Sequence, residues 1–404
     1  MKPRIFIAIH YLELGGAEIS LIGLLNAIDT SRYDVDLFVY SHRGELMKMI
    51  PSGVHVLPEI KEYAQIEKPV KEVLKQGGWK IALARLWAKF QFSRYVKRCR
   101  PKEGSAIFQY VFNVVTPLLP DLYKYGEYDL AISFLTPHNI VAEKVHAKKK
   151  IAWIHTDYTR ISVDVDKELP VWRKFDKIVS ISQDVTKTFS LIFPSLSDKI
   201  IEINNILSPS LVRKRAEEFS VLLSKEASQV NLLSVGRYTF AKNYDNVPDI
   251  CKRIRETGCN VYWYIIGYGG DEALIRSKIK EAGMEDYVIL LGKKENPYPY
   301  MKACDIYVQP SRFEGNSVTV REAQMLCKPV IVTDYPTAQS QILQGIDGVI
   351  VLLDNIKCAR GIVEVIKNRN LQDKLVTYLK THDYGNEQEV EKIYQLILRD
   401  KNDT

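Results

Sequence analysis

The chain has 404 residues, of which 46% are apolar, and a formal net charge of +7. This length exceeds what one compact domain usually holds, so we expect two domains with two cores. The six cysteines are scattered without a C-x-x-C pair, a pattern that argues against a disulfide scaffold or a zinc site. No signal peptide or spanning segment is apparent, so we expect a soluble, cytoplasmic protein.

Short apolar, β-branched runs alternate with helical patterns along the whole chain. The first series of candidate strands covers 4–10, 35–40, 130–135, 150–155 and 177–182, and the second covers 231–236, 261–267, 287–292, 305–310 and 329–334. Strands that are apolar throughout are buried on both faces, which predicts parallel sheets covered by helices. We therefore predict an α/β protein with two doubly wound, Rossmann-like domains that face each other across a cleft, with ligands bound at the carboxyl ends of the strands.

The domain limits follow from where the strands stop. Residues 204–229 are polar and lack a strand, so we interpret them as the linker. The predicted domains are then 1–205 and 206–384. Residues 385–404 have helical spacing and follow the last strand, so we expect them to pack back on the first domain.

Two candidate sites follow strands of the first domain. Gly15 and Gly16 come after strand 4–10 and would let the backbone approach a ligand at the start of the next helix. No G-x-G-x-x-G is present, and a plain strand-to-helix turn is the alternative. His155 stands at the end of strand 150–155 and could bond a hydroxyl or phosphate oxygen, although a lone histidine is more often structural.

In the second domain, Arg237 and Lys242 lie in the loop that follows strand 231–236. Two cations at a strand end could neutralise a diphosphate and assist its departure as a leaving group. A solvated basic loop is the alternative. Gly267, Gly269 and Gly270 follow the next strand, and we interpret them as serving backbone geometry.

Glu314 and Glu322 stand eight positions apart around a predicted helix start. Glu314 would lie at the mouth of the loop and accept hydrogen bonds from sugar hydroxyls, while Glu322 could accept from the two vicinal hydroxyls of a ribose. Free N–H groups at the helix start can hold a phosphate. The residues that would provide them are Asn316, Ser317 and Val318. The alternative for both carboxylates is surface charge paired with the helix dipole.

Four segments in this order resemble the retaining, nucleotide-sugar-dependent glycosyltransferases of family 4, which have the GT-B architecture. They are GGAE (15–18), SVGRYTFAKN (234–243), IIGYGG (265–270) and the run 288–334 that holds both glutamates. The resemblance implies transfer of a sugar, with retention, from a UDP- or GDP-sugar to a saccharide acceptor. It further implies a lipid-linked acceptor in surface polysaccharide assembly, and neither a metal nor a bound cofactor.

The resemblance also implies roles for the candidate residues. Glu322 would hold the nucleotide ribose, and Glu314 with the amides that follow it would hold the donor sugar. Arg237 and Lys242 would bind the diphosphate. Segment 292–301 would lie near the base.

In the first domain, Gly16 would let the backbone approach the donor phosphates, and His155 would lie beside the transferred sugar. The chain departs from the family at Asn316 and Ser317, where a Gly-Pro type pair is more usual, and at 335–342, which lacks a Gly pair. Because these positions lie near the donor sugar, its identity stays open.

Residues 75–102 form a basic, aromatic stretch with nine Lys or Arg and no acidic residue. Within it, Trp79, Leu83, Leu86, Trp87 and Phe90 fall on one face of a helix. Such a helix suits the surface of an anionic membrane, and we expect a peripheral protein on that basis. The alternative is that the stripe packs on the first domain and its cations face water.

A nucleotide-sugar epimerase of GT-B architecture and a non-catalytic nucleotide-sugar-binding protein are the alternatives to a transferase. Nucleic-acid binding is not expected, since no recognition motif is present. Two D-x-D strings, Asp34/Asp36 and Asp164/Asp166, are interpreted as incidental and not as metal sites.

Overall fold

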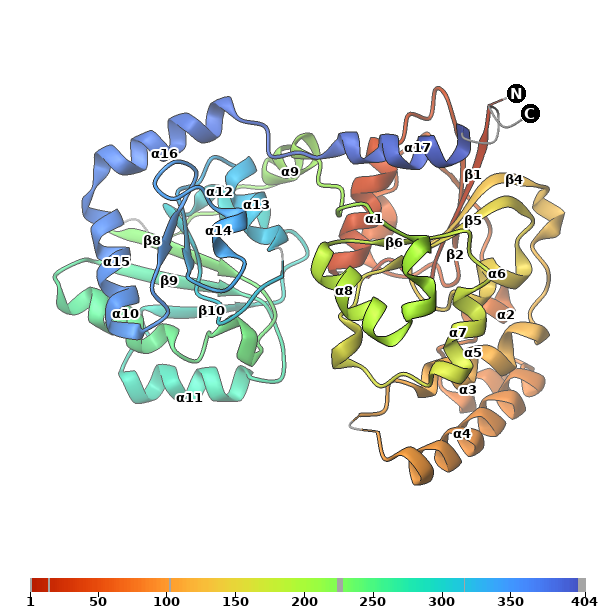
Figure 1. Cartoon of the computed structure of the whole chain (residues 1–404). Coiled ribbons are helices and arrows are strands. Elements are labelled where there is room, and N and C mark those ends of the chain that lie inside the picture. The colour runs from red at the N-terminus through yellow and green to blue at the C-terminus, as the bar shows by residue number, and fades with distance from the viewer. Residues whose placement is uncertain (1, 14, 102, 224–227, 316, 399–404) are drawn as a thin grey trace. The chain divides into compact units, whose positions relative to one another are not determined.

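The computed structural model describes residues 2–398 except 14, 102, 224–227 and 316 (Figure 1). The chain divides into two compact units. Unit 1 consists of residues 1–207 together with the segment from Asn386 onward, and unit 2 consists of residues 208–385.

Unit 1 is built on a parallel sheet with the strand order β3-β2-β1-β4-β5-β6-β7. Its strands are β1 (Arg4–Ile9), β2 (Asp34–Val39), β3 (His55–Val56), β4 (Tyr128–Ser133), β5 (Ala147–Ile154), β6 (Lys177–Ser180) and β7 (Ile200–Glu202). Its helices are α1 (Gly16–Ala27), α2 (Lys61–Ala64), α3 (Val70–Lys75), α4 (Trp79–Cys99), α5 (Ile107–Val115), α6 (Asn139–Lys144), α7 (Val165–Trp172), α8 (Gln183–Ile192) and α17 (Val390–Leu398).

Unit 2 repeats this plan with the strand order β10-β9-β8-β11-β12-β13, again parallel. Its strands are β8 (Val230–Val235), β9 (Val261–Ile266), β10 (Val288–Gly292), β11 (Ile306–Gln309), β12 (Val330–Thr333) and β13 (Val349–Val351). Its helices are α9 (Pro209–Ala216), α10 (Val247–Glu256), α11 (Glu272–Ala282), α12 (Tyr298–Ala303), α13 (Val318–Met325), α14 (Ala338–Gln341), α15 (Asn355–Lys367) and α16 (Arg369–Thr381).

Both sheets have the doubly wound order, in which the fourth strand of the unit pairs with the first and starts the second half of the sheet. The order reverses between β1 and β4 in unit 1 and between β8 and β11 in unit 2. Ligands of open α/β sheets bind outside the carboxyl ends of the strands at such a switch point. The predicted fold class of two doubly wound α/β domains is confirmed.

The buried strands follow the apolar runs of the sequence. In β8, for example, the five residues after Val230 are all buried, and so are the last four of β9. The short strands β3, β7 and β13 were not anticipated, because runs of two or three residues carry little pattern. Residues 204–229 are also more than a linker, since α9 lies within them and packs against α12 and α13 in unit 2.

The C-terminal helix α17 belongs to unit 1 and not to the unit that precedes it in the chain. Tyr394 stacks on Tyr33 with ring centroids 4.3 Å apart, and its hydroxyl accepts a hydrogen bond of 2.8 Å from the amide of Asp29. Lys149 of β5 donates to the carbonyl of Leu396 at 2.7 Å. These contacts attach the end of the chain to the sheet of unit 1.

Helix α4 packs on α3 and α5 through one face, on which Ile81, Ala82 and Ala88 are buried. The opposite face is exposed. The side chains of its apolar stripe are between 52% and 57% exposed, and they are Trp79, Leu83, Leu86, Trp87 and Phe90. The alternative in which this stripe packs on the first domain is therefore wrong. Among the described residues, no helix is long and apolar enough to span a bilayer.

Candidate functional site

The switch point of unit 2 brings together two loops that the sequence places far apart. Strands β8 and β11 are neighbours, with Leu232 opposite Ile306 and Leu233 opposite Tyr307. Because the strands are parallel, the loop after β8, which holds Arg237 and Lys242, and the loop after β11, which holds Glu314, meet at one edge of the sheet. This is the position at which doubly wound folds bind their ligands.

Lys242 and Glu314 form an ion pair across this switch point. The ammonium of Lys242 lies 2.6 Å from Oε1 of Glu314, and the two side chains are 19% and 12% exposed. The same oxygen accepts from Ser311 Oγ at 2.5 Å and from Gln309 Nε2 at 3.0 Å. Three donors thus hold one carboxylate oxygen in place, which preorganises both charges of the pair.

A second ion pair clamps the two loops together nearby. Arg312 donates to both carboxylate oxygens of Asp245, at 2.9 and 2.7 Å. It also donates to the carbonyl of Phe240 at 2.6 Å, and its guanidinium lies over the ring of the same residue. Bidentate pairs of this kind fix geometry as well as charge. The clamp holds the segment that carries Lys242 in a defined position.

Arg237 lies in the same loop but is exposed. It forms no hydrogen bond or ion pair with any other residue that the structure describes. The structure therefore brings Lys242 and Glu314 into contact and leaves Arg237 as a cation with an unoccupied guanidinium at the surface of the same loop. The contact of Arg237 with a diphosphate stays a prediction.

Glu322 is buried one turn inside α13, at 4% exposure. Its Oε1 accepts a hydrogen bond of 2.7 Å from the hydroxyl of Tyr298, a residue at the start of α12. The guanidinium of Arg215 lies over the ring of Tyr298, 5.2 Å from its centroid. Burial raises the pKa of Glu322 to about 7, against the opposing effects of the Tyr298 hydrogen bond and the Arg215 charge.

The start of α13 differs from the expectation of free N–H groups. The backbone N–H of Ser317 donates to Oε1 of Gln341 at 3.2 Å. The side-chain Nε2 of Gln341 donates back to the backbone carbonyl of Ser317 at 2.6 Å. The N–H of Ser317 is therefore already occupied. Val318 is the first residue of the helix and is half-buried, whereas the predicted contact from Asn316 lies outside the described residues.

The glycines divide into those with tight surroundings and those without. A Cβ on Gly267 would lie 1.9 Å from the carbonyl oxygen of Gly236, so the loops after β8 and β9 approach more closely than a side chain allows. A Cβ on Gly269 would lie 2.4 Å from the carbonyl oxygen of Tyr238. A Cβ on Gly16 in unit 1 would meet nothing within 4 Å, so nothing within its own unit requires a glycine there.

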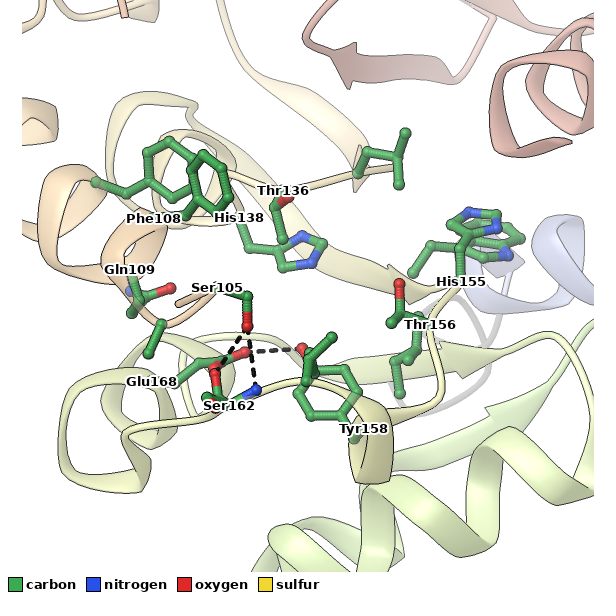
Figure 2. Close-up of a pocket in the computed structure, with 16 residues that line it drawn as sticks. Ser105, Phe108, Gln109, Thr136, His138, His155, Thr156, Tyr158, Ser162 and Glu168 are labelled. Carbon is green, nitrogen blue, oxygen red and sulfur yellow. Dashed lines mark hydrogen bonds between the residues drawn. The ribbon is translucent and has the colours of Figure 1, made fainter. Parts of the chain in front are cut away.

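Unit 1 has a pocket of about 240 Å³ at the carboxyl ends of β4 and β5. Figure 2 shows His138 and His155 on one side and Ser105, Ser162 and Glu168 on another. Its wall mixes aromatic rings with hydroxyl, amide and carboxyl groups. The remaining aromatic and amide members are Phe108, Gln109, Phe112, Trp153 and Tyr158. Stacking surfaces combined with polar groups suit a saccharide.

His155 is the member of this pocket that the sequence predicted. Neither of its ring nitrogens has a well-aligned hydrogen bond within the described part of the chain, although the backbone of Phe134 interacts with the imidazole. Burial lowers its pKa to about 3, so the imidazole is neutral at physiological pH. A buried polar group without a partner is costly, which makes these nitrogens available to a ligand hydroxyl. By contrast, the neighbouring His138 shares a hydrogen bond of 2.8 Å with Ser133.

Several residues of both sites were not anticipated. Tyr298 and Arg215 reach Glu322 from other segments, although the stretch 292–301 that contains Tyr298 was expected nearby. Glu168 in the pocket accepts from Tyr158 at 2.7 Å and from Trp172 at 3.0 Å, and burial raises its pKa. Glu168 lies within α7 and not directly after a strand, so its position in the sequence did not mark it as a candidate ligand contact.

The D-x-D strings have structural partners in this unit. Asp36 accepts from Arg4 at 2.9 Å and from Tyr128 at 2.6 Å, and it contacts His55 at 2.8 Å. Asp164 accepts from the hydroxyl of Tyr110. These contacts account for both carboxylates within the fold of unit 1.

Comparison with known proteins places these sites in a family context. Residues 215–382, which lie within unit 2, match the family model described as glycosyl transferases group 1. The amylovoran biosynthesis glycosyltransferase AmsD of Erwinia amylovora is 23% identical over 326 residues, covering 79% of this chain and 82% of that protein. An N-acetylgalactosaminyltransferase of Campylobacter jejuni is 30% identical over 125 residues. That match covers 31% of this chain and 33% of the relative, whose name gives a diphospho-undecaprenol-linked saccharide as the acceptor.

Among solved structures, HepE of Anabaena in complex with UDP aligns over 100% of both chains, with a TM-score of 0.59 and 15% identity. This likeness shows that the chain has the GT-B fold. Together with the domain match, it supports a GT-B glycosyltransferase.

Proposed function

We propose that the chain is a retaining glycosyltransferase that moves a sugar from a nucleoside-diphosphate donor, with UDP-sugar as the first candidate, to a saccharide acceptor. The observation that carries the proposal is the Lys242–Glu314 pair, held by three donors at the switch point of unit 2. The name of the Erwinia amylovora relative gives amylovoran biosynthesis as its role, and the name of the Campylobacter jejuni relative gives a lipid-linked saccharide as its acceptor. We extend both features to this chain as part of the proposal.

Each residue then has a task in the transfer. Glu322 accepts the ribose hydroxyls, while Arg237 and Lys242 neutralise the diphosphate as the bond to the anomeric carbon breaks. Glu314, together with the backbone at Val318, positions the hydroxyls of the transferred sugar. These cations supply the counter-charge that a metal ion gives in other transferases, so we propose a metal-independent reaction.

In unit 1 the pocket beside His155 would take the acceptor saccharide. The neutral imidazole can donate to one sugar hydroxyl and accept from another, and the aromatic rings of the wall can stack on the sugar face. Gly16 offers open space at the start of α1, where backbone could approach the donor phosphates.

Donor binding is tested by thermal shift with UDP, GDP and ADP. A nucleotide at 100 times its dissociation constant stabilises the folded protein by about 2.7 kcal/mol. We expect the UDP or GDP shift to disappear in Glu322→Ala and to persist in Glu256→Ala, which changes an exposed glutamate of the same unit. Equal shifts in both variants would contradict the ribose assignment.

Catalysis is tested with the bound donor and a panel of saccharide acceptors. Lys242→Ala is expected to lower the rate of transfer by about 10²- to 10³-fold, the usual cost of removing one donor to a developing charge. The exposed Lys252→Ala serves as its control. EDTA should leave the rate unchanged, and NMR of the product should show the anomeric configuration of the donor. An epimerised sugar nucleotide as product would replace transfer by epimerisation.

A further inference from the structure

The exposed face of α4 has features that the transfer reaction does not use. Five large apolar side chains stand more than half exposed along three turns of the helix. Trp79 and Phe90 mark its two ends. Soluble proteins rarely expose a contiguous apolar patch without a partner for it.

The cations around this face have no ion-pair partner in the described part of the chain, and two of them, Lys80 and Arg94, lie over the rings of Trp79 and Phe90. Lys80, Lys89, Arg94 and Lys97 are exposed, and none of them forms an ion pair with a residue that the structure describes. Arg94 and Lys97 follow Phe90 at i+4 and i+7, so they continue the same face of the helix beyond the apolar part. One half of the face is thus apolar and the other half basic.

The opposite face fixes the helix firmly to unit 1. Ile81 and Ala88 are buried in the contact with the neighbouring helices. Arg85 reaches from α4 to the carbonyl of Lys68, and Tyr95 packs its ring against Tyr110 of α5, with centroids 5.8 Å apart. The exposed ridge is therefore a rigid part of the folded surface. Figure 1 shows α4 at the end of unit 1 that lies away from α17.

We propose that this face of α4 docks unit 1 on an anionic lipid bilayer. The five apolar side chains would enter the boundary between headgroups and acyl chains, and the basic half would bind lipid phosphates. An anionic partner is required because residues 75–102 contain no acidic group. The regular stripe of Trp, Leu and Phe at helical spacing matches a planar interface.

The docking surface also has a place in the proposed reaction. Helix α5 packs on α4 and carries Phe108, which is 60% exposed and lines the pocket beside His155. A bilayer on α4 would thus lie one helix away from the pocket proposed for the acceptor. This last step rests on the proposed function, whereas the docking itself does not.

Flotation of the full-length protein tests the docking without donor or turnover. Vesicles of phosphatidylcholine with about 30% phosphatidylglycerol, which gives them a negative surface potential, are compared with pure phosphatidylcholine. We expect the protein to float with the anionic vesicles and to be released by salt. Recovery in the soluble fraction with both vesicle types would overturn the proposal, and it would leave the transfer reaction untouched.

Two variants test whether the basic residues of α4 are needed for binding to the vesicles. The triple variant Lys80→Gln, Arg94→Gln and Lys97→Gln should lower partitioning about 100-fold, since each basic residue contributes roughly fivefold. A matched variant with the same net charge changes exposed lysines of unit 2. It carries Lys252→Gln, Lys280→Gln and Lys374→Gln. Equal flotation of these two variants would contradict docking through α4.

Tryptophan fluorescence provides a second test of docking, which uses the wild-type protein. Trp79 and Trp87 are 57% and 53% exposed, whereas Trp153, Trp172 and Trp263 are at most 3% exposed. Quenching by acrylamide therefore reports on α4, and anionic vesicles should protect its tryptophans and shift their emission to the blue. The variant Trp87→Ser with Leu83→Ser should lose flotation, while Leu191→Ser with Leu222→Ser, at positions that are even more exposed, should keep it.

Light scattering without vesicles measures the oligomeric state and tests whether a second copy of the chain covers the α4 face instead of a membrane. If the α4 face were covered by a second copy of the chain, the wild type would be a dimer, and the Trp87→Ser and Leu83→Ser substitutions would make it monomeric. A dimer of that kind that stays soluble with anionic vesicles would overturn the membrane assignment.

Discussion

Glu322 is the residue whose environment has the clearest measurable consequence. It is a carboxyl group with 4% exposure, one hydroxyl donor and a pKa raised by burial to about 7 from an ordinary 4.5. Such a group holds its proton in the folded protein over a range in which the unfolded chain has lost it. Because the pKa differs between the folded and the unfolded protein, the free energy of unfolding depends on pH.

Substitution of Glu322 by Gln should therefore change how stability depends on pH. Between pH 4.5 and 7 the folded wild type binds more protons than the unfolded chain, so its stability falls as pH rises, by at most about 1.4 kcal/mol per pH unit. Below about pH 4.5 and above about pH 7, Glu322 does not contribute to the change of stability with pH. Glu322→Gln lacks the titration, so its stability relative to wild type should grow across the window.

Urea unfolding of the two proteins at pH 4.5, 5.5, 6.5 and 7.5, about one unit apart, measures this difference. Glu256→Gln, at an exposed position of the same unit, is the control that should run parallel to the wild type. Parallel curves for Glu322→Gln as well would show that the carboxyl group is not held neutral in the folded state.

At the scale of elements, the loops after β8 and β9 depend on their mutual closeness. Gly267→Ala would bring a methyl group to 1.9 Å from the carbonyl oxygen of Gly236, and this backbone atom cannot swing aside. The loop that carries Arg237 and Lys242 would have to move. We expect a loss of about 1–3 kcal/mol of stability, as for overpacked cores, together with a lower rate of transfer.

Gly270→Ala is the matched control, since a Cβ there meets nothing within 4 Å and Gly270 follows the same strand. Thermal unfolding and the transfer rate of the two variants are compared side by side. If Gly267→Ala behaved like Gly270→Ala, the close approach of the two loops would not matter for the site.

The elements also show what sequence patterns can and cannot reveal. The long strands were predictable because burial on both faces requires an uninterrupted apolar run, as in β1 and β9. The meeting of Lys242 with Glu314 was foreseeable for a similar reason, since both follow parallel strands. The hydrogen bond of Tyr298 to Glu322 was not, because it joins two helices whose packing depends on the whole of unit 2. The same holds for Glu168.

Across the whole molecule, the chain enters unit 2 after Leu207 and returns to unit 1 at Asn386. The returning segment is then needed to complete unit 1. We expect Tyr394→Ala to lower the stability of unit 1 by about 3–5 kcal/mol, since a buried aromatic ring is lost together with its stack on Tyr33.

Unit 2 has its own core, so its unfolding should be unaffected by this change. Tyr123→Ala, at an exposed position of unit 1, is the control. Hydrogen exchange followed by mass spectrometry distinguishes the two units. Faster exchange in unit 2 alone, or in both units equally, would contradict the assignment of α17 to unit 1.

The two points at which the chain changes unit lie side by side. The amide of Leu207 donates to Oδ1 of Asn386 at 2.8 Å, and Gly385 lies against Pro209. Residues 208–385 thus form a cassette whose two ends adjoin. The cassette is inserted into unit 1 at a single place, between residues 207 and 386. A gene encoding the cassette alone, or one joining 207 to 386 through a short turn, would leave the core of each unit whole, so we expect each unit to fold without the other.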